Sequence, residues 1–179
     1  MNNLRKAKIE ESEKILEFYQ NIIDSIEGTQ FKPKWSKHYP NLEFIKTSIE
    51  KQEMYVHTKD NDIIACVVLN NRFYPEYDNI DWIIEAEPEE IVIIHTFALT
   101  SDFAGKGIGR EIFNQIKNNA LKNNQKTIRI DIINGNIGAQ NVFEKFGFEY
   151  VDTVEIFHDI VGLEKFHLYE WVSAKTNFF

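Results

Sequence analysis

The distribution of hydrophobic residues between positions 91 and 120 predicts a buried strand, a short break and an amphipathic helix. Ile91 to Ile94 form a bulky, mostly β-branched run, typical of a strand covered on both faces, and residues 95–99 continue it. Glycines occupy every second position of the break, at residues 105, 107 and 109. The helix that follows has one apolar face, formed by Ile108, Ile112, Ile116 and Ala120, with Phe113 beside it.

Apolar spacing along the rest of the chain predicts further strands and helices. Asn41 and Asn136 stand where helix N-caps are expected, because each precedes an apolar pattern of helical period. We expect a polar turn at residues 59–62 and a loop at 28–40, which holds two prolines. The expected strands are 4–9, 54–58, 63–70, 127–132, 148–157 and 164–172; one helix is expected from Ser12, one over 41–52 and one after Asn136.

This order of elements predicts an α/β fold. We expect a single domain over residues 1–179, with a mixed, mostly antiparallel twisted sheet of six to seven strands and helices on both faces. The length of 179 residues and a hydrophobic content of 43% suit one domain with a full core.

Charge and composition argue against several functional classes. A net charge of −8 and a pI near 5.2 do not suit a nucleic-acid-binding surface. The single cysteine, Cys66, leaves no internal disulfide or cysteine metal site and is interpreted as a small buried hydrophobe. The charged N-terminus is unlike a signal peptide, and the longest apolar run, 63–69, is too short for a membrane helix of about 20 residues. We therefore expect a cytoplasmic protein without nucleic-acid or membrane partners, and a homodimer stays open.

Residues 71–90 are unusually acidic. They hold seven acidic residues against Arg72 alone, a net −6 of the chain's −8. One interpretation is a solvated excursion between two strands, as charge runs usually are. The other is that the segment borders the acceptor site and attracts a cationic amine, with its interleaved aromatic residues as a wall. The segment's position is not evident from the sequence, so both interpretations stay open.

A strand, a glycine loop and a helix N-terminus in this order predict an anion site. Free backbone N–H groups and the positive end of the helix dipole point at the same place, so a phosphate group is the expected ligand. The dinucleotide fingerprint is absent because Gly107 and Gly109 are followed by Arg110, Glu111 and Ile112, and the Walker pattern is absent too. The alternative is a glycine-rich turn that binds nothing.

The loop resembles the acyl-CoA loop of the GNAT superfamily of N-acetyltransferases, whose pattern is Gln/Arg-x-x-Gly-x-Gly/Ala after a strand ending in Ala-Val. Ala98-Leu99 ends the strand here, and Gly107-Ile108-Gly109 matches the second half of the pattern. Ala104 stands where the family usually has Gln or Arg.

A second stretch, residues 136–148 (NIGAQNVFEKFGF), is similar to another signature of the same superfamily, Asn-x-x-Ala followed by Tyr-Glu-Lys-x-Gly-Phe. Phe143 occupies the position of the family's usual tyrosine, which in many members donates a proton to the departing CoA thiolate. The resemblance covers residues 54–172, with an acyl-CoA-binding core at about 91–150.

The resemblance implies that acetyl-CoA is the cofactor and that its pantetheine arm fits beside the central strand. Backbone N–H groups near Phe97 and Leu99 would bind the thioester oxygen and the arm if the strand bulges there. The expected cofactor-binding residues are Phe97, Ala98, Leu99, Ala104, Gly105, Lys106, Gly107, Ile108, Gly109, Arg110, Asn136 and Phe143.

His95 is the expected general base. It shares a face of the strand with Ile93, Phe97 and Leu99 by sequence alternation, and an ordinary imidazole pKa near 6.5 suits proton removal near neutral pH. The alternative is a core histidine held by a backbone carbonyl. Glu90 and Asp131 are secondary candidates for the base. The general acid is not assigned among Tyr39, Tyr74, Tyr150 and Tyr169.

Two functions follow from these residues. The first is an acetyl-CoA-dependent N-acetyltransferase that acts on a primary amine of a small molecule or peptide, without a metal. The second is a catalytically silent CoA-binding or regulatory module on the same fold, suggested by Ala104 and Phe143. The identity of the acceptor is not encoded in any pattern that we recognise.

Overall fold

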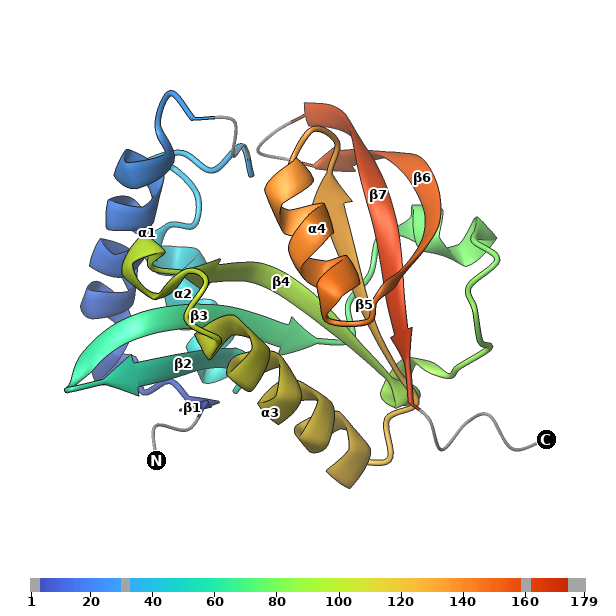
Figure 1. Ribbon diagram of the computed structural model, residues 1–179, viewed down its shortest axis with the longest axis horizontal. Coiled ribbons are helices and arrows are strands. Elements are labelled where there is room, and N and C mark those ends of the chain that lie inside the picture. The colour runs from blue at the N-terminus through green and yellow to red at the C-terminus, as the bar shows by residue number, and fades with distance from the viewer. Residues whose placement is uncertain (1–3, 30–32, 159–161, 174–179) are drawn as a thin grey trace. The chain divides into compact units, whose positions relative to one another are not determined.

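The computed structural model describes residues 4–29, 33–158 and 162–173, which contain a mixed sheet of seven strands in the order β1-β2-β3-β4-β5-β7-β6 (Figure 1). β4 and β5 are parallel, whereas the pairs β1/β2, β2/β3, β5/β7 and β6/β7 are antiparallel, so the predicted fold class is confirmed. The strands are β1 (Arg5–Lys6), β2 (Met54–Lys59), β3 (Asp62–Asn70), β4 (Ile91–Leu99), β5 (Thr127–Ile133), β6 (Glu149–His158) and β7 (Gly162–Val172). The α-helices are α1 (Ser12–Ile26), α2 (Leu42–Glu50), α3 (Ile108–Lys122) and α4 (Ile137–Lys145).

The described residues fall into two compact units. The first takes residues 4–29, 35–69 and 95–116, and the second takes 33–34, 70–94, 117–158 and 162–173. The division crosses β4 between Ile94 and His95. We describe each unit by itself, and the extent of one N-acetyltransferase domain over 1–179 stays a prediction.

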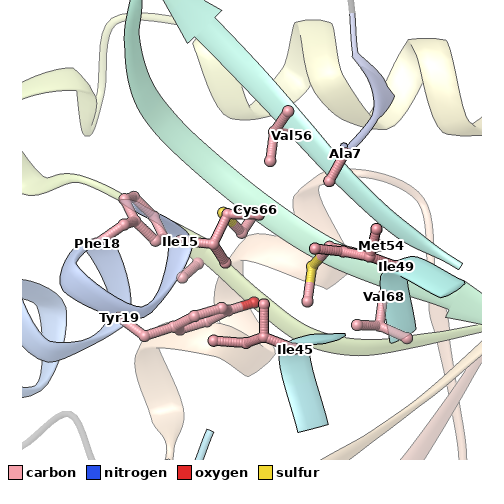
Figure 2. Packing of buried hydrophobic residues seen from close by; sticks show 11 residues of the cluster. Ala7, Ile15, Phe18, Tyr19, Ile45, Ile49, Met54, Val56, Cys66 and Val68 are labelled. Carbon is pink, nitrogen blue, oxygen red and sulfur yellow. The ribbon is translucent and has the colours of Figure 1, made fainter. Parts of the chain in front are cut away.

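The core of the first unit lies between two helices and two strands. The apolar faces of α1 and α2 pack against alternate residues of β2 and β3, as Figure 2 shows. Cys66 is fully buried in this core, as expected. Asn41 caps α2, because its side-chain oxygen accepts a hydrogen bond of 2.9 Å from the Phe44 N–H. The core residues of this cluster are Ala7, Ile15, Phe18, Tyr19, Ile45, Ile49, Met54, Val56, Cys66, Val68 and Ala98.

Helix α3 begins at Ile108, directly after the glycine loop, as the sequence predicts. Ile112, Phe113 and Ile116 of its first turns are buried. The ring of Phe113 meets that of Phe97 on β4 edge-on, with 5.0 Å between centroids. This contact joins the first turns of α3, which follow the glycine loop, to β4.

The second unit has its own apolar core on the sheet. Ile91 and Ile93 of β4 pack with Phe166 and Leu168 of β7 and with Tyr77 from the acidic segment. β4 runs parallel to β5 from the pair Ile91 and Thr127 to the pair Ile94 and Ile130. The buried aliphatic run is therefore the part of β4 that lies inside the parallel ladder, as predicted.

The first predicted strand differs from the observed one. The first strand covers only Arg5–Lys6, because the Glu11 carboxylate binds the Arg5 guanidinium at 2.6 Å and accepts from the Lys8 N–H at 2.8 Å, which turns the chain into a short 3-10 helix (Ile9–Glu11). The loop predicted at 28–40 is confirmed for its described residues, 28–29 and 33–40, which form no helix or strand, and Ser36 and Tyr39 form an isolated bridge there.

Candidate functional site

Strand β4 departs from regular strand geometry at Thr96. Thr96 has φ +48°, a left-handed conformation that a β-branched residue adopts only under constraint. Its carbonyl oxygen accepts a hydrogen bond of 2.8 Å from the hydroxyl of Tyr19, which is fully buried in α1. Burial raises the Tyr19 pKa well above its ordinary value, so the hydroxyl keeps its proton and continues to donate.

This irregularity changes what sequence alternation implies for His95. Phe97 packs on α3 and Ala98 packs in the α1 and α2 core, so alternation resumes after Thr96. The left-handed Thr96 interrupts the alternation of side chains between the two faces of β4. Alternation therefore no longer supports the expectation that His95 shares a face with Phe97 and Leu99. His95 is half-buried and immediately precedes the left-handed residue.

The glycine loop is open and poor in internal contacts. Gly105 and Gly107 have φ +73° and +84°, and a Cβ at either would meet nothing within 4 Å, so the backbone conformation, not crowding, requires glycine. The third glycine differs from the expectation: Gly109 lies inside α3 and has no positive φ. Within the described part of the chain, the N–H groups of Gly105 and Gly107 donate no hydrogen bond.

Two buried hydroxyls near the loop also lack partners. The Oγ1 atoms of Thr96 and Thr100 are inaccessible to water and form no hydrogen bond to any residue described. Helix α3 adds the first-turn N–H groups that every helix leaves without an internal partner. Ala104, Lys106, Ile108 and Arg110 belong to this same segment of the first unit. The arrangement suits an anionic ligand with several acceptor oxygens.

Asn136 and Phe143 belong to the second unit, whereas the loop residues belong to the first. Asn136 caps α4, where its side-chain oxygen accepts from the Ala139 N–H at 3.2 Å, so its predicted capping role is confirmed. Phe143 is 3% exposed and meets the Phe148 ring edge-on at 5.2 Å. The position of the family's tyrosine is thus a core position here.

A sequence profile of the acetyltransferase (GNAT) family matches residues 20–148. The chain belongs to this family. The uncharacterized N-acetyltransferase YesJ of Bacillus subtilis is 26% identical over 60% of this chain and 58% of its own length. The uncharacterized N-acetyltransferase MJ1207 of Methanocaldococcus jannaschii is 23% identical over 85% of this chain and 62% of its own. The chain therefore spans less than two thirds of the length of either relative.

Solved structures share the GNAT fold. A GNAT-family acetyltransferase from Streptococcus agalactiae superposes with a TM-score of 0.75 at 19% identity, covering 96% of this chain and 95% of that one. YncA of Salmonella typhimurium, solved with its cofactor acetyl-CoA, superposes with a TM-score of 0.66 at 12% identity, covering 95% and 92%. At these identities the likeness concerns the fold alone.

The other titratable candidates of this GNAT protein occupy different surroundings. Glu90 forms an ion pair of 2.7 Å with Lys126, and the Lys126 ammonium lowers the pKa of that carboxyl. Asp131 on β5 follows the last residue paired with β4, and burial raises its pKa to about 6. Burial raises the pKa of Tyr77 well above its ordinary value, and Asp131 adds to this shift.

The four tyrosines considered as general acids have different partners, although the Tyr150 and Tyr169 rings meet edge-on with 5.8 Å between centroids. Tyr39 lies in the first unit with its ring edge-on to Phe44, and Tyr74 contacts the His158 ring in the second. Tyr150 exchanges a hydrogen bond of 2.8 Å with the Thr153 hydroxyl. The Tyr169 hydroxyl donates to the Glu144 carboxylate at 3.2 Å, and burial together with that carboxylate raises its pKa to about 12.

Sequence reasoning missed a buried polar cluster in the second unit. Arg129 Nε and the Thr127 hydroxyl both donate to Glu170 Oε1, at 2.8 and 2.7 Å. The Ile83 N–H donates to Glu170 Oε2 at 2.6 Å, and the Arg129 guanidinium lies 4.0 Å from the Trp82 ring centroid. A charged residue inside the apolar run of β5 was the signal for this cluster.

This cluster makes contacts with the acidic segment, residues 71–90. Trp82 and Ile83 are held on the sheet, whereas Asp81, Glu85, Glu87 and Glu89 point to solvent. The segment is therefore an anchored cover with an acidic outer surface, and its role toward an acceptor stays a prediction. None of the described helices is long and apolar enough to cross a membrane.

Proposed function

We propose that the protein is an acetyl-CoA-dependent N-acetyltransferase that transfers an acetyl group to a primary amine of a small molecule or peptide by direct attack on the thioester. The observation that carries the proposal is the open loop at Gly105 and Gly107, whose N–H groups have no partner in the described chain and precede a helix N-terminus. GNAT membership and the acetyl-CoA found in the Salmonella relative support the choice of cofactor.

The residues present fit the phosphate end of this cofactor. Backbone oxygens and side chains leave the space beside Gly105 and Gly107 open, and a pyrophosphate accepts several N–H bonds at once. The donors proposed for the phosphate groups are the amides of the exposed Gly105 and Gly107 and the first-turn N–H groups of α3. We propose the backbone of Phe97 to Leu99 for the pantetheine arm, and Asn136 and Phe143 as further cofactor-binding residues of the second unit. When bound, acetyl-CoA supplies an activated acyl group.

His95 would take the acceptor's proton, directly or through a water molecule. A neutral imidazole accepts a proton near physiological pH, and the residue lies on the strand segment that carries the proposed thioester-binding amides. Asp131 is the alternative base, because a carboxyl with a pKa of about 6 still titrates near neutral pH. Glu90 is engaged by Lys126 and is less suited.

A second candidate function is a CoA-binding module without catalysis. Phe143 favours it, because a buried phenyl ring cannot protonate a leaving thiolate. Ala104 favours it as well, since it lacks the polar side chain usual in the family.

Two measurements on the purified protein distinguish the functions. Calorimetric titration with acetyl-CoA measures binding, and thiol release over a panel of small amines and peptides measures turnover. Binding with amine-dependent thiol release supports the transferase, and binding without it supports the silent module. Absence of binding would refute both.

A further inference from the structure

Two lysines from different elements converge on one aromatic ring beside the glycine loop. Lys59 ends β2, and its ammonium lies 4.8 Å from the centroid of the Phe103 ring. Lys106 lies within the loop, and its ammonium lies 5.7 Å from the same centroid. Phe103 ends a short 3-10 helix (Ser101–Phe103) just before Gly105. All three residues belong to the first unit.

A tight hairpin turn fixes the position of Lys59. Asp60 and Asn61 both have positive φ, +50° and +71°, as the two central residues of a type I′ turn do. Lys59 is paired with Asp62 across this turn, so its backbone is fixed and only its side chain is mobile. The hairpin therefore brings a cation to the loop from a distant part of the sequence.

Neither ammonium has an anionic partner within the described chain. Asp60, Asp62 and Asp102 are close in sequence, yet no carboxylate oxygen lies within ion-pair distance of Lys59 or Lys106. Two like charges near one ring repel each other, and the nearby N-terminus of α3 adds positive potential. The two ammonium groups therefore add a positive potential beside the loop that an anionic ligand would neutralise.

We propose that Lys59 and Lys106 form a phosphate-binding pair for the nucleotide part of acetyl-CoA, with Phe103 as the platform that orients them. The proposal rests on the proposed cofactor and adds Lys59, a residue outside the glycine loop. A cation–π contact with the half-buried Phe103 ring is weak, so each ammonium keeps its charge and its hydrogen-bond donors for a phosphate oxygen.

The experiment is a calorimetric titration of CoA at low and high ionic strength, with the parent and with Lys59→Gln. We expect Lys59→Gln to weaken binding about three- to tenfold at low salt, and the difference to shrink at high salt because the attraction is screened. Lys46→Gln, an exposed lysine on α2, is the matched control, since it makes the same charge change elsewhere in the first unit. Lys59→Arg should restore affinity.

Dephospho-CoA identifies which phosphate the pair binds. If the ammonium groups contact the 3′-phosphate, the loss caused by Lys59→Gln disappears with this ligand. If they contact the pyrophosphate, the loss persists. Phe103→Leu, which keeps an apolar side chain but removes the ring, should lower affinity for CoA as well.

The outcomes separate this inference from the proposed function. A parent that binds CoA, together with Lys59→Gln and Lys46→Gln variants of equal affinity, would overturn the lysine pair and leave the cofactor proposal intact. A parent that does not bind CoA would overturn both.

Discussion

Polar groups have protein partners in the Arg129–Glu170 cluster of the second unit and lack them in the glycine loop of the first. In the cluster, both oxygens of the 0%-exposed Glu170 accept hydrogen bonds from the protein. In the loop, the amides of Gly105 and Gly107 and the ammonium groups of Lys59 and Lys106 have no hydrogen-bonding or anionic partner in the described chain. Polar groups satisfied internally stabilise a fold, whereas accessible donors left without partners are available to a ligand.

The comparison predicts opposite consequences of substitution. Changes on the loop side should reduce binding or turnover with little effect on folding. Changes in the cluster should reduce stability, with activity per folded molecule preserved.

His95→Ala is the largest expected change on the loop side. If His95 accepts the proton of the acceptor, kcat should fall by about 10²–10⁴ at neutral pH with CoA affinity little affected. The loss should shrink as pH rises, because more of the amine is already deprotonated. The measurements are pH-rate profiles and melting temperatures of both proteins. A lower melting temperature with constant activity per folded molecule would identify a core histidine instead.

Glu170→Ala is the corresponding change in the cluster. It leaves the Arg129 guanidinium buried without its carboxylate, so we expect the free energy of unfolding to fall by about 3–5 kcal/mol. Urea denaturation measures this quantity. Glu155→Ala, an exposed position on β6, is the matched control and should have little effect. Equal stabilities of the two variants would show that the buried pair contributes little to the free energy of unfolding.

Asp131 belongs neither to the glycine loop nor to the Arg129–Glu170 cluster, and Asp131→Asn tests how its carboxyl affects stability. Its folded-state pKa is raised to about 6 from 3.8, so the folded state holds the proton more tightly than the unfolded state does. Its contribution to stability is therefore present below about pH 4 and is lost as pH rises through about 6. Asn removes the charge, so the variant should gain melting temperature relative to the parent at pH 7.5 and little at pH 4.5. A constant difference across pH would show that Asp131 does not titrate in this range.

Gly107→Val should reduce CoA affinity at least about tenfold, or 1.4 kcal/mol, because a side chain would occupy the open space at the loop. The positive φ of Gly107 also makes any β-branched residue strained, so some stability is lost. Gly28→Val is the matched control: Gly28 has φ +76° and equally open surroundings, in a turn after α1. Calorimetry should show normal CoA binding in the control, and equal affinities would exclude the loop as the phosphate site.

The acidic surface should have the smallest effect. Glu85 and Glu89 are exposed and form no ion pair within the described chain, unlike Glu90. If they attract a cationic acceptor, changing both to Gln should lower kcat/KM for amines a few fold, and the parent's kcat/KM should fall with added salt. Glu13→Gln with Glu17→Gln on α1 is the control of equal charge. Unaltered kinetics would support the solvated interpretation.

The sequence determined the local parts of this molecule. Strand and helix positions followed from apolar period, and Asn41 and Asn136 were identified as caps because an N-cap acts within three residues of itself. The glycine loop was evident for the same reason, since positive φ at Gly105 and Gly107 is a local backbone property with a residue type of its own. The first strand was overextended because the Glu11 carboxylate competes for the backbone there.

Only the tertiary structure decided the contacts between residues far apart in sequence. The left-handed Thr96 has no sequence signature, because its carbonyl is bound by the Tyr19 hydroxyl, 77 residues away. Arg129 meets Glu170 across 41 residues, and Lys59 meets Phe103 only because the hairpin folds toward the loop. Such pairings depend on strand register and helix packing, which are collective properties of the whole fold and are not encoded in any single stretch of sequence.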